Sequence, residues 1–475
     1  MTDAIDRSGK TARGAVRKKS RLRMISLTSA FALACAGAVG AQAASASAAT
    51  TASYSGTLAD SAQWIAQVPA DWNGTVVLYS HGFGPLTAAD APSPGSGAQL
   101  LAQGYALVGS SYDVNGSWWA LDTAVSDQFG SLAAFLAASG LHPQRTLAVG
   151  TSMGGLINSL IDQESYGRVQ GAVTFCGLVA GGVDLNNYQL NAEYAMTELL
   201  PGAAGVQIRD FASMAAGTDA GADLSAAVTS AQSTAAGRAR IALSAALLNE
   251  TDWTTGPTPP AAGDYAGQEL QEEEMLTSGQ LQFIESGRYS IALAEGGDSG
   301  YNIGVDYGAL IRQSPYYRQI KALYKAAGLN LRADIATLDE HESYAPEGNS
   351  LRRTQATSVN TGRLQVPELD VHTVSDQLAP VPFEATYAER VALAGSSPLL
   401  RQVYANAIGH CNFTDADMVA AIDAMNNVVV ARHWTPGVTV TALNDAANAL
   451  DPALGGGNFT ADHPHPLVVQ NALDR

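Results

Sequence analysis

The chain has 475 residues, with 26 lysines and arginines against 44 acidic residues and a formal net charge of −18. Eight of the basic residues and only two of the acids lie in residues 1–48, so the remainder is more acidic than the chain as a whole. Because phosphate binding needs a basic face, this balance nearly excludes nucleic acid as the main partner and argues against an anionic membrane surface.

Residues 1–48 have the layout of a secretory signal peptide. A cationic stretch ends at Arg23, an apolar segment follows to about Gly40, and small residues such as those at 46–48 come after it. We therefore expect an exported, secreted protein. Two alternatives remain: a membrane anchor, for which the apolar segment is short, and a lipoprotein linked through Cys35. Since no later apolar run reaches the length of a membrane span, we expect no stable membrane anchor.

Strand-like and helix-like patterns alternate in the next part of the chain. Two short strands are predicted between 54 and 69, followed by apolar runs that predict buried strands at 75–80, 105–110, 145–150 and 169–176. Apolar residues at helical spacing lie between them, at 124–138 and 156–161. Strands that alternate with helices imply an α/β fold class with a parallel sheet covered on both sides.

The alternation stops after Gly177. From about 178 to 362 the chain is rich in alanine, acidic and aromatic residues, and it shows helical periodicity in pieces. A proline-rich stretch at 256–260 indicates a loop inside this region.

The alternation then resumes with predicted strands at 364–373 and 399–407 and a helix from Asp415 whose start resembles a capping box. After the first 48 residues, the remaining chain is longer than one hydrophobic core usually serves. We therefore predict one α/β domain in two parts, 49–177 and 363–475, split by a helical insertion.

Residues Gly150-Thr151-Ser152-Met153-Gly154 fit the pattern G-x-S-x-G. Alone the pattern is weak, but here it follows an apolar strand and precedes an amphipathic helix, which is the setting of a nucleophile elbow. Ser152 is therefore the candidate nucleophile. The alternative is an ordinary glycine-rich turn between a strand and a helix.

A serine nucleophile needs a base, and the base needs an acid to orient it. In this architecture the chain order is serine, acid, histidine. Asp376 lies on the loop after a predicted strand, and His410 lies on a loop before the capped helix. We predict these two as partners of Ser152. Asp370 is the rival acid, disfavoured because it lies within the strand, and His372 in the same strand is interpreted as packed.

The segment Ser80-His81-Gly82-Phe83-Gly84 follows a predicted strand beside the elbow strand. This place suits the second donor to a tetrahedral oxyanion, so His81 is interpreted as structural. We expect the backbone N–H groups of Phe83 and Met153 to hold the oxyanion. Trp118 and Trp119 either line the substrate cleft or pack in the core.

At these residues the chain resembles the α/β-hydrolase superfamily, over about 49–177 and 363–440. The resemblance implies a mostly parallel sheet flanked by helices and a catalytic Ser-Asp-His set. The insertion at 178–362 stands before the acid-bearing strand, where these enzymes carry a cap or lid, so we expect a largely helical cap there.

Two cysteines, Cys176 and Cys411, lie after the predicted signal peptide. Cys411 comes directly after the histidine, which resembles tannases and feruloyl esterases, where a cysteine before the serine bonds to one after the histidine. The match is incomplete because Thr151 precedes the serine here. Cys176 ends the strand next to the elbow strand, so we predict a Cys176–Cys411 disulfide that fixes the base loop. Two buried free thiols are the alternative.

The sequence contains no recognisable metal-binding motif, and we expect neither a metal nor a cofactor. His463 and His465 are interpreted as a solvated loop, and Glu272-Glu273-Glu274 as a solvated helix face. We predict a secreted serine hydrolase that cleaves a small-molecule carboxylic ester through an acyl-enzyme. The alternatives are a peptidase of the prolyl-oligopeptidase or tripeptidyl-aminopeptidase type, an acyltransferase, and an inactive cell-surface binding protein.

Overall fold

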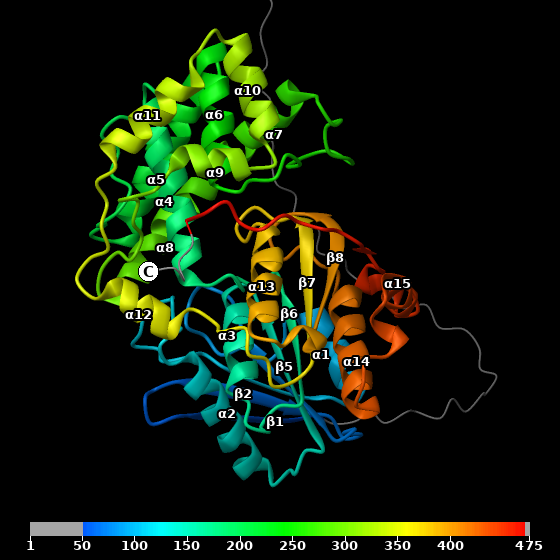
Figure 1. Cartoon of the computed structure of the whole chain (residues 1–475). Helices are drawn as coiled ribbons and strands as arrows, with labels where there is room; N and C mark the ends of the chain where they lie inside the picture. Colours follow the sequence, from blue (N-terminus) through cyan, green and yellow to red (C-terminus); the bar gives the residue numbers. More distant parts are fainter. Residues whose placement is uncertain (1–50, 471–475) are drawn as a thin grey trace, which may run out of the picture. The chain divides into compact units, whose positions relative to one another are not determined.

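The computed structural model describes residues 51–470, and the predicted signal peptide therefore lies outside the described residues. A nine-stranded sheet forms the centre, in the order β1-β2-β4-β3-β5-β6-β7-β8-β9 (Figure 1). The strands are β1 Ala52–Thr57, β2 Gln63–Val68, β3 Thr75–Ser80, β4 Ala106–Ser110, β5 Arg145–Thr151, β6 Gly171–Phe175, β7 Glu368–Ser375, β8 Leu400–Ile408 and β9 Phe459–Thr460.

The six strands from β3 to β8 are mutually parallel, whereas the pairs β1/β2, β2/β4 and β8/β9 are antiparallel. The parallel strands are buried on both faces. In β3, Val76 and Leu78 enter one hydrophobic cluster, while Val77 and Tyr79 enter the other. This two-sided burial is the physical reason for the continuous apolar runs in the sequence.

Helices cover both faces of the sheet (Figure 1). One cluster joins α2, α3 and α13 to the sheet, and the other joins α1, α14 and α15 to it. These helices are α1 Pro94–Ala102, α2 Ala124–Ser139, α3 Met153–Gln163, α13 Pro382–Leu393, α14 Asp415–Ala431 and α15 Val440–Asn448. The arrangement confirms the predicted α/β-hydrolase fold, with a mostly parallel sheet flanked by helices.

Between β6 and β7 the chain forms helices and no strand among its described residues, and we refer to α4 through α12 as the helical segment. Its members pack on one another, for example α5 on α8 and α4 on α6. They are α4 Gly182–Leu199, α5 Met214–Ala231, α6 Ala235–Leu247, α7 Tyr265–Thr277, α8 Gln280–Glu295, α9 Tyr307–Gln313, α10 Tyr317–Ala326, α11 Leu331–His341 and α12 Ser350–Thr357. The helical character agrees with the sequence, and the domain boundaries at 178 and 362 stay predictions.

Local sequence explains several element ends. Thr414 and Asp417 form a reciprocal capping box at the start of α14, as the sequence predicts. Gly140 ends α2 in the left-handed conformation at φ 69°. The sequence did not predict α1, α13 or α15, because their apolar stripes are short and include many alanines.

One prediction about the helical segment is wrong. Glu272 does not lie on a solvated face, because it is buried in α7 and accepts a hydrogen bond from Gln319 Nε2 at 2.9 Å. Its neighbour Glu274 is exposed, as expected. The error arises because α7 is covered on this side by α10, whose place on α7 is decided by tertiary packing.

Within residues 51–470, no helix is long and apolar enough to cross a membrane.

Candidate active site

Ser152 sits in a sharp turn between β5 and α3. Its backbone has φ 59° and ψ −124°, a strained conformation for a residue with a side chain. The turn is possible because its flanking positions are glycines: a Cβ on Gly150 would lie 2.0 Å from the Gly154 carbonyl oxygen, and one on Gly154 would lie 2.0 Å from the Ser80 carbonyl oxygen. The strain aims the hydroxyl away from the sheet, as in a nucleophile elbow.

Three side chains that are far apart in the sequence meet at this turn. His410 Nε2 lies 2.8 Å from Ser152 Oγ, and His410 Nδ1 lies 2.9 and 2.8 Å from the two carboxylate oxygens of Asp376. Because a carboxylate only accepts, Nδ1 carries the proton, so Nε2 accepts from the serine hydroxyl. The structure therefore brings all three predicted residues together, and Asp370, the rival acid, does not bond to His410.

Asp376 is fully buried and held from several sides. Its Oδ1 accepts the backbone N–H groups of Leu378 and Ala379, both at 2.9 Å. Burial by itself would raise the pKa of this carboxyl, but the charge and hydrogen bond of His410, with His372 and the backbone donors, bring the pKa below the ordinary aspartate value. The acid is thus kept ionised inside the protein.

The predicted disulfide between Cys176 and Cys411 is present in the structure. Cys176 directly follows β6, whose neighbour β5 carries the elbow, and Cys411 directly follows His410. The bond therefore ties the histidine loop to the strand beside the nucleophile. It also lies within reach of the imidazole, since Cys411 Sγ is 3.5 Å from His410 Nε2.

The loop after β3 lies against the nucleophile, as predicted. A Cβ on Gly82 would be 3.0 Å from Ser152 Cβ, so only a residue without a side chain allows this approach. The next residue, Phe83, and the first residue of α3, Met153, are the expected oxyanion donors. Their placement beside Ser152 fits that role.

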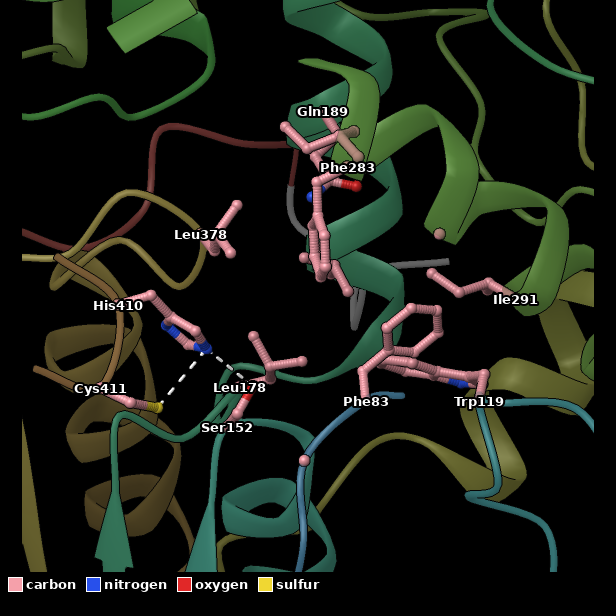
Figure 2. Close-up of a pocket in the computed structure, with 14 residues that line it drawn as sticks. Phe83, Trp119, Ser152, Leu178, Gln189, Phe283, Ile291, Leu378, His410 and Cys411 are labelled. Carbon is pink, nitrogen blue, oxygen red and sulfur yellow. Dashed lines mark hydrogen bonds between the residues drawn. The ribbon is translucent and has the colours of Figure 1, made fainter. Parts of the chain in front are cut away.

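Ser152 lies at the wall of an apolar cavity of about 280 Å³ (Figure 2). Its lining residues come from the sheet loops and from two helices of the helical segment, α4 and α8: Gly82, Phe83, Trp119, Ser152, Leu178, Leu185, Gln189, Phe283, Ile284, Gly287, Ile291, Leu378, His410 and Cys411. Apart from the catalytic candidates, Gln189 supplies the one polar side chain of this lining. Figure 2 shows Phe83, Phe283 and Leu178 around the space above Ser152.

The structure also places the two tryptophans and His81, which the sequence analysis singled out. Trp119 lines the cavity, and Trp118 contacts the Phe83 ring edge-on, with centroids 5.8 Å apart. His81 stacks on Tyr112 and its Nδ1 lies 2.8 Å from the Gly82 carbonyl oxygen, while burial lowers its pKa. His81 is thus structural, as expected.

Sequence reasoning missed the cavity residues of α4 and α8. Their apolar spacing is the same as that of any packed helix, so no signal in the sequence separates a substrate-facing leucine from a core leucine. His372 is packed and buried, as the sequence predicts, but its ring also lies 3.6 Å from Asp376. No signal in the sequence shows this contact, because it depends on the turn of the chain after β7.

In the part of the chain that the structure describes, two clusters of side chains have the composition of metal ligands. Cys176, His410 and Cys411 form one, but both sulfurs are consumed by the disulfide. Asp210, Asp298 and Glu347 form the other, and Arg209 lies within 4.0 Å of all three carboxylates. The guanidinium of Arg209 therefore already supplies a positive charge among these carboxylates.

Comparisons with known proteins give distant similarities. The o-phthalyl amidase of Xanthobacter agilis is 24% identical over 422 residues, which cover 83% of this chain and 90% of that protein. A mutant of the rice cell wall degrading esterase of Xanthomonas oryzae has a TM-score of 0.40 at 11% identity, covering 79% of this chain and 90% of that chain. An esterase from Aspergillus oryzae has a TM-score of 0.39 at 15% identity, covering 78% and 77%. No protein-family model matches this chain.

Proposed function

We propose that this chain, a hydrolase with the α/β-hydrolase fold, is a secreted serine hydrolase that cleaves carboxylic esters through an acyl-enzyme on Ser152. The observation that carries the proposal is the continuous set of hydrogen bonds from Ser152 through His410 to Asp376 at the wall of an apolar cavity. A triad that merely packed would not need to open into such a space.

In the first half of the reaction, Ser152 Oγ attacks the ester carbonyl carbon while His410 Nε2 takes the serine proton. Asp376 stabilises the imidazolium that forms. The N–H groups of Phe83 and Met153 donate to the oxyanion, where fixed dipoles meet developing charge at no reorganisation cost. His410 then returns its proton to the leaving alcohol, which leaves an acyl group on the serine.

In the second half, a water molecule attacks the acyl-enzyme and gives a proton to His410 Nε2. The second tetrahedral intermediate collapses, the acid product leaves, and the proton returns to Ser152 Oγ.

The cavity supports a compact, uncharged acyl group. Its walls are aliphatic and aromatic, and about 280 Å³ is small for a drug-sized ligand but sufficient for a ring or a short chain. The lining includes no carboxylate, since Asp376 lies behind His410 and does not line the cavity. A free substrate amine would lack a counter-charge there, which disfavours the aminopeptidase alternative.

Amide cleavage is the second candidate function. It is favoured by the similarity to an o-phthalyl amidase across 83% of this chain, because that relative's name denotes an aromatic acyl group on an amide. The same triad serves both bonds, and the aromatic wall of the cavity suits either substrate.

We also propose that the helical segment acts as a cap and that the protein is exported. Leu185 and Gln189 of α4 and Phe283, Ile284 and Ile291 of α8 form much of the cavity wall, which supports the cap. The disulfide supports an oxidising compartment. N-terminal sequencing of the exported protein would test the leader, since a start near residue 49 is expected.

Reaction with a fluorophosphonate probe tests the proposed function. Wild-type protein should be labelled at Ser152, and Ser152→Ala should not be labelled. Absence of labelling of the folded wild type would overturn the proposal.

A matched pair of substrates then separates the two candidates. p-Nitrophenyl benzoate and benzoic acid p-nitroanilide carry the same acyl group on an ester and on an amide. Turnover of the ester alone supports an esterase, and comparable kcat/KM on the anilide supports the amidase.

A further inference from the structure

His372 is a buried histidine on β7 that the proposed reaction does not use. Its side chain has no exposed surface. The two ring nitrogens both face oxygens: Nδ1 lies 2.9 Å from Glu384 Oε1 on α13, and Nε2 lies 2.7 Å from the backbone oxygen of Ala379. The ring is therefore held between α13 and the loop that follows β7, the loop that carries Asp376.

The partners of the ring determine where its protons lie. A backbone carbonyl only accepts, so Nε2 carries a proton. The other carboxylate oxygen of Glu384 accepts a hydrogen bond from Gln402 Nε2 at 2.6 Å. With Nδ1–H donated to Glu384, both nitrogens are protonated and the ring is an imidazolium.

The charges around the ring favour this form. The Nε2 atom is also 3.6 Å from Asp376 Oδ2, so two carboxylates flank one imidazole. Burial by itself would lower the pKa of His372, but Glu384, through its hydrogen bond and charge, and Asp376, through its charge, raise the pKa above the ordinary histidine value. No neighbouring cation opposes them among the described contacts of this ring.

Two further titratable groups lie on the strands that carry or neighbour the ring, Asp370 on β7 and Tyr404 on β8. Asp370, two residues earlier on β7, has a pKa raised well above its ordinary value by burial and by Glu368. Tyr404, the partner of His372 on β8, has a raised pKa because it is buried near Glu384. The short distances from the ring to carboxylate oxygens are to Glu384 and Asp376.

We propose that His372 is a positioning residue for the triad: as a permanent imidazolium it keeps Asp376 ionised and fixes the loop from Asp376 to Ala379. The proposal rests on the proposed function, because it concerns the acid of that triad. Asp376 thus lies between two histidines. His410 exchanges protons with the substrate, while His372 stays charged behind the carboxylate.

The pH profile of kcat/KM in the variant His372→Gln tests this role. Loss of a cation beside the dyad of Asp376 and His410 makes protonation of that dyad easier, so the acid limb should move to higher pH by about one unit. KM should change little, because His372 does not line the cavity. His433→Gln, at an exposed position, is the matched control and should keep the wild-type profile. A folded His372→Gln variant with an unchanged acid limb would overturn the proposal.

A second measurement needs no variant and decides the question if His372→Gln does not fold. Nitrogen NMR of ¹⁵N-histidine-labelled wild type should show one buried ring with both nitrogens protonated, at a pH where exposed histidines have lost a proton. A buried ring with one protonated nitrogen would contradict the proposal. Failure of the wild type to react with the fluorophosphonate would instead reject the proposed function, so the two failures are distinguishable.

Discussion

Buried carboxyl groups at the active site and in the helical segment respond to burial in opposite ways. Asp376 has a lowered pKa, because two histidines and two backbone N–H groups face it. In the helical segment, burial raises the pKa of Glu272 to about 8, and its hydrogen-bond donor is the neutral amide of Gln319. A single hydrogen bond from a neutral amide does not replace the lost hydration of a charge, whereas nearby positive charge together with several donors opposes the effect of burial.

The helical segment also contains a buried cation beside two acids. Arg288 contacts both Glu193 and Glu285, all three buried between α4 and α8. Burial raises the pKa of Glu193 to about 7 and that of Glu285 well above its ordinary value, and the shared arginine offsets these shifts only in part. The active site is therefore organised to keep a charge, while the helical segment tolerates neutral acids behind an apolar wall.

Substitution of Asp376, compared with the same substitution at Asp370 on β7, should give the largest effect on activity. Asp376→Asn removes the acceptor that holds the Nδ1–H tautomer of His410, so kcat should fall by about 10⁴-fold. Asp370→Asn changes a buried acid that does not bond to His410 and should leave kcat within a few-fold. Ester hydrolysis under saturating substrate measures both. Equal losses in the two folded variants would return Asp370 to the position of rival acid.

Removal of the disulfide should have the next largest effect. In the double variant Cys176→Ala, Cys411→Ala the crosslink over a sequence separation of 235 is lost, which should lower the free energy of unfolding by about 3 to 5 kcal/mol. kcat should also fall, because the His410 loop is no longer tied to β6. Denaturant unfolding with and without reductant measures the change. Reductant should destabilise the wild type alone, and a wild type insensitive to reductant would contradict the prediction.

A larger side chain on α8 that fills part of the cavity should change the acyl-group specificity without altering the triad. A Cβ on Gly287 would meet only the Phe83 ring, at 3.8 Å, so a side chain there extends into the cavity. Gly287→Leu should lower kcat/KM for benzoyl esters by about a hundredfold relative to acetyl esters. Gly287→Ala, the control, adds one methyl group and favours the helix. An unchanged benzoyl to acetyl ratio would show that the acyl group binds elsewhere.

Titration of Glu272 should have the smallest effect, on stability. Its pKa in the folded protein, about 8, lies above the ordinary 4.5, so the folded state binds the proton more tightly. Its contribution is therefore present below about pH 4.5 and is lost as the pH rises through 8. Glu272→Gln should reduce this fall in the free energy of unfolding by a few kcal/mol at most.

Thermal unfolding at acidic and mildly alkaline pH measures this difference. Glu274→Gln changes an exposed acid two residues further along α7 and should leave the pH dependence of unfolding as in the wild type. A slope that is the same in both variants would mean that Glu272 does not titrate in the folded protein.

The amino-acid sequence by itself determined the sheet core, the elbow and the three residues that meet there. Apolar runs specify strands buried on both faces, glycines at 150 and 154 specify a turn that other residues would block, and the chain order restricts the acid and the base. The cysteine pair followed from adjacent strand ends. These are local features, or features that the topology of a parallel sheet makes nearly local.

Only the tertiary structure decided what surrounds the triad. Burial of Glu272 depends on the packing of α10 on α7, and the cavity wall depends on which faces of α4 and α8 turn toward Ser152. The protonation of His372 depends on Glu384, twelve residues away on another element. Burial and electrostatic environment arise from neighbours that are distant in sequence, so no local pattern of residues encodes them.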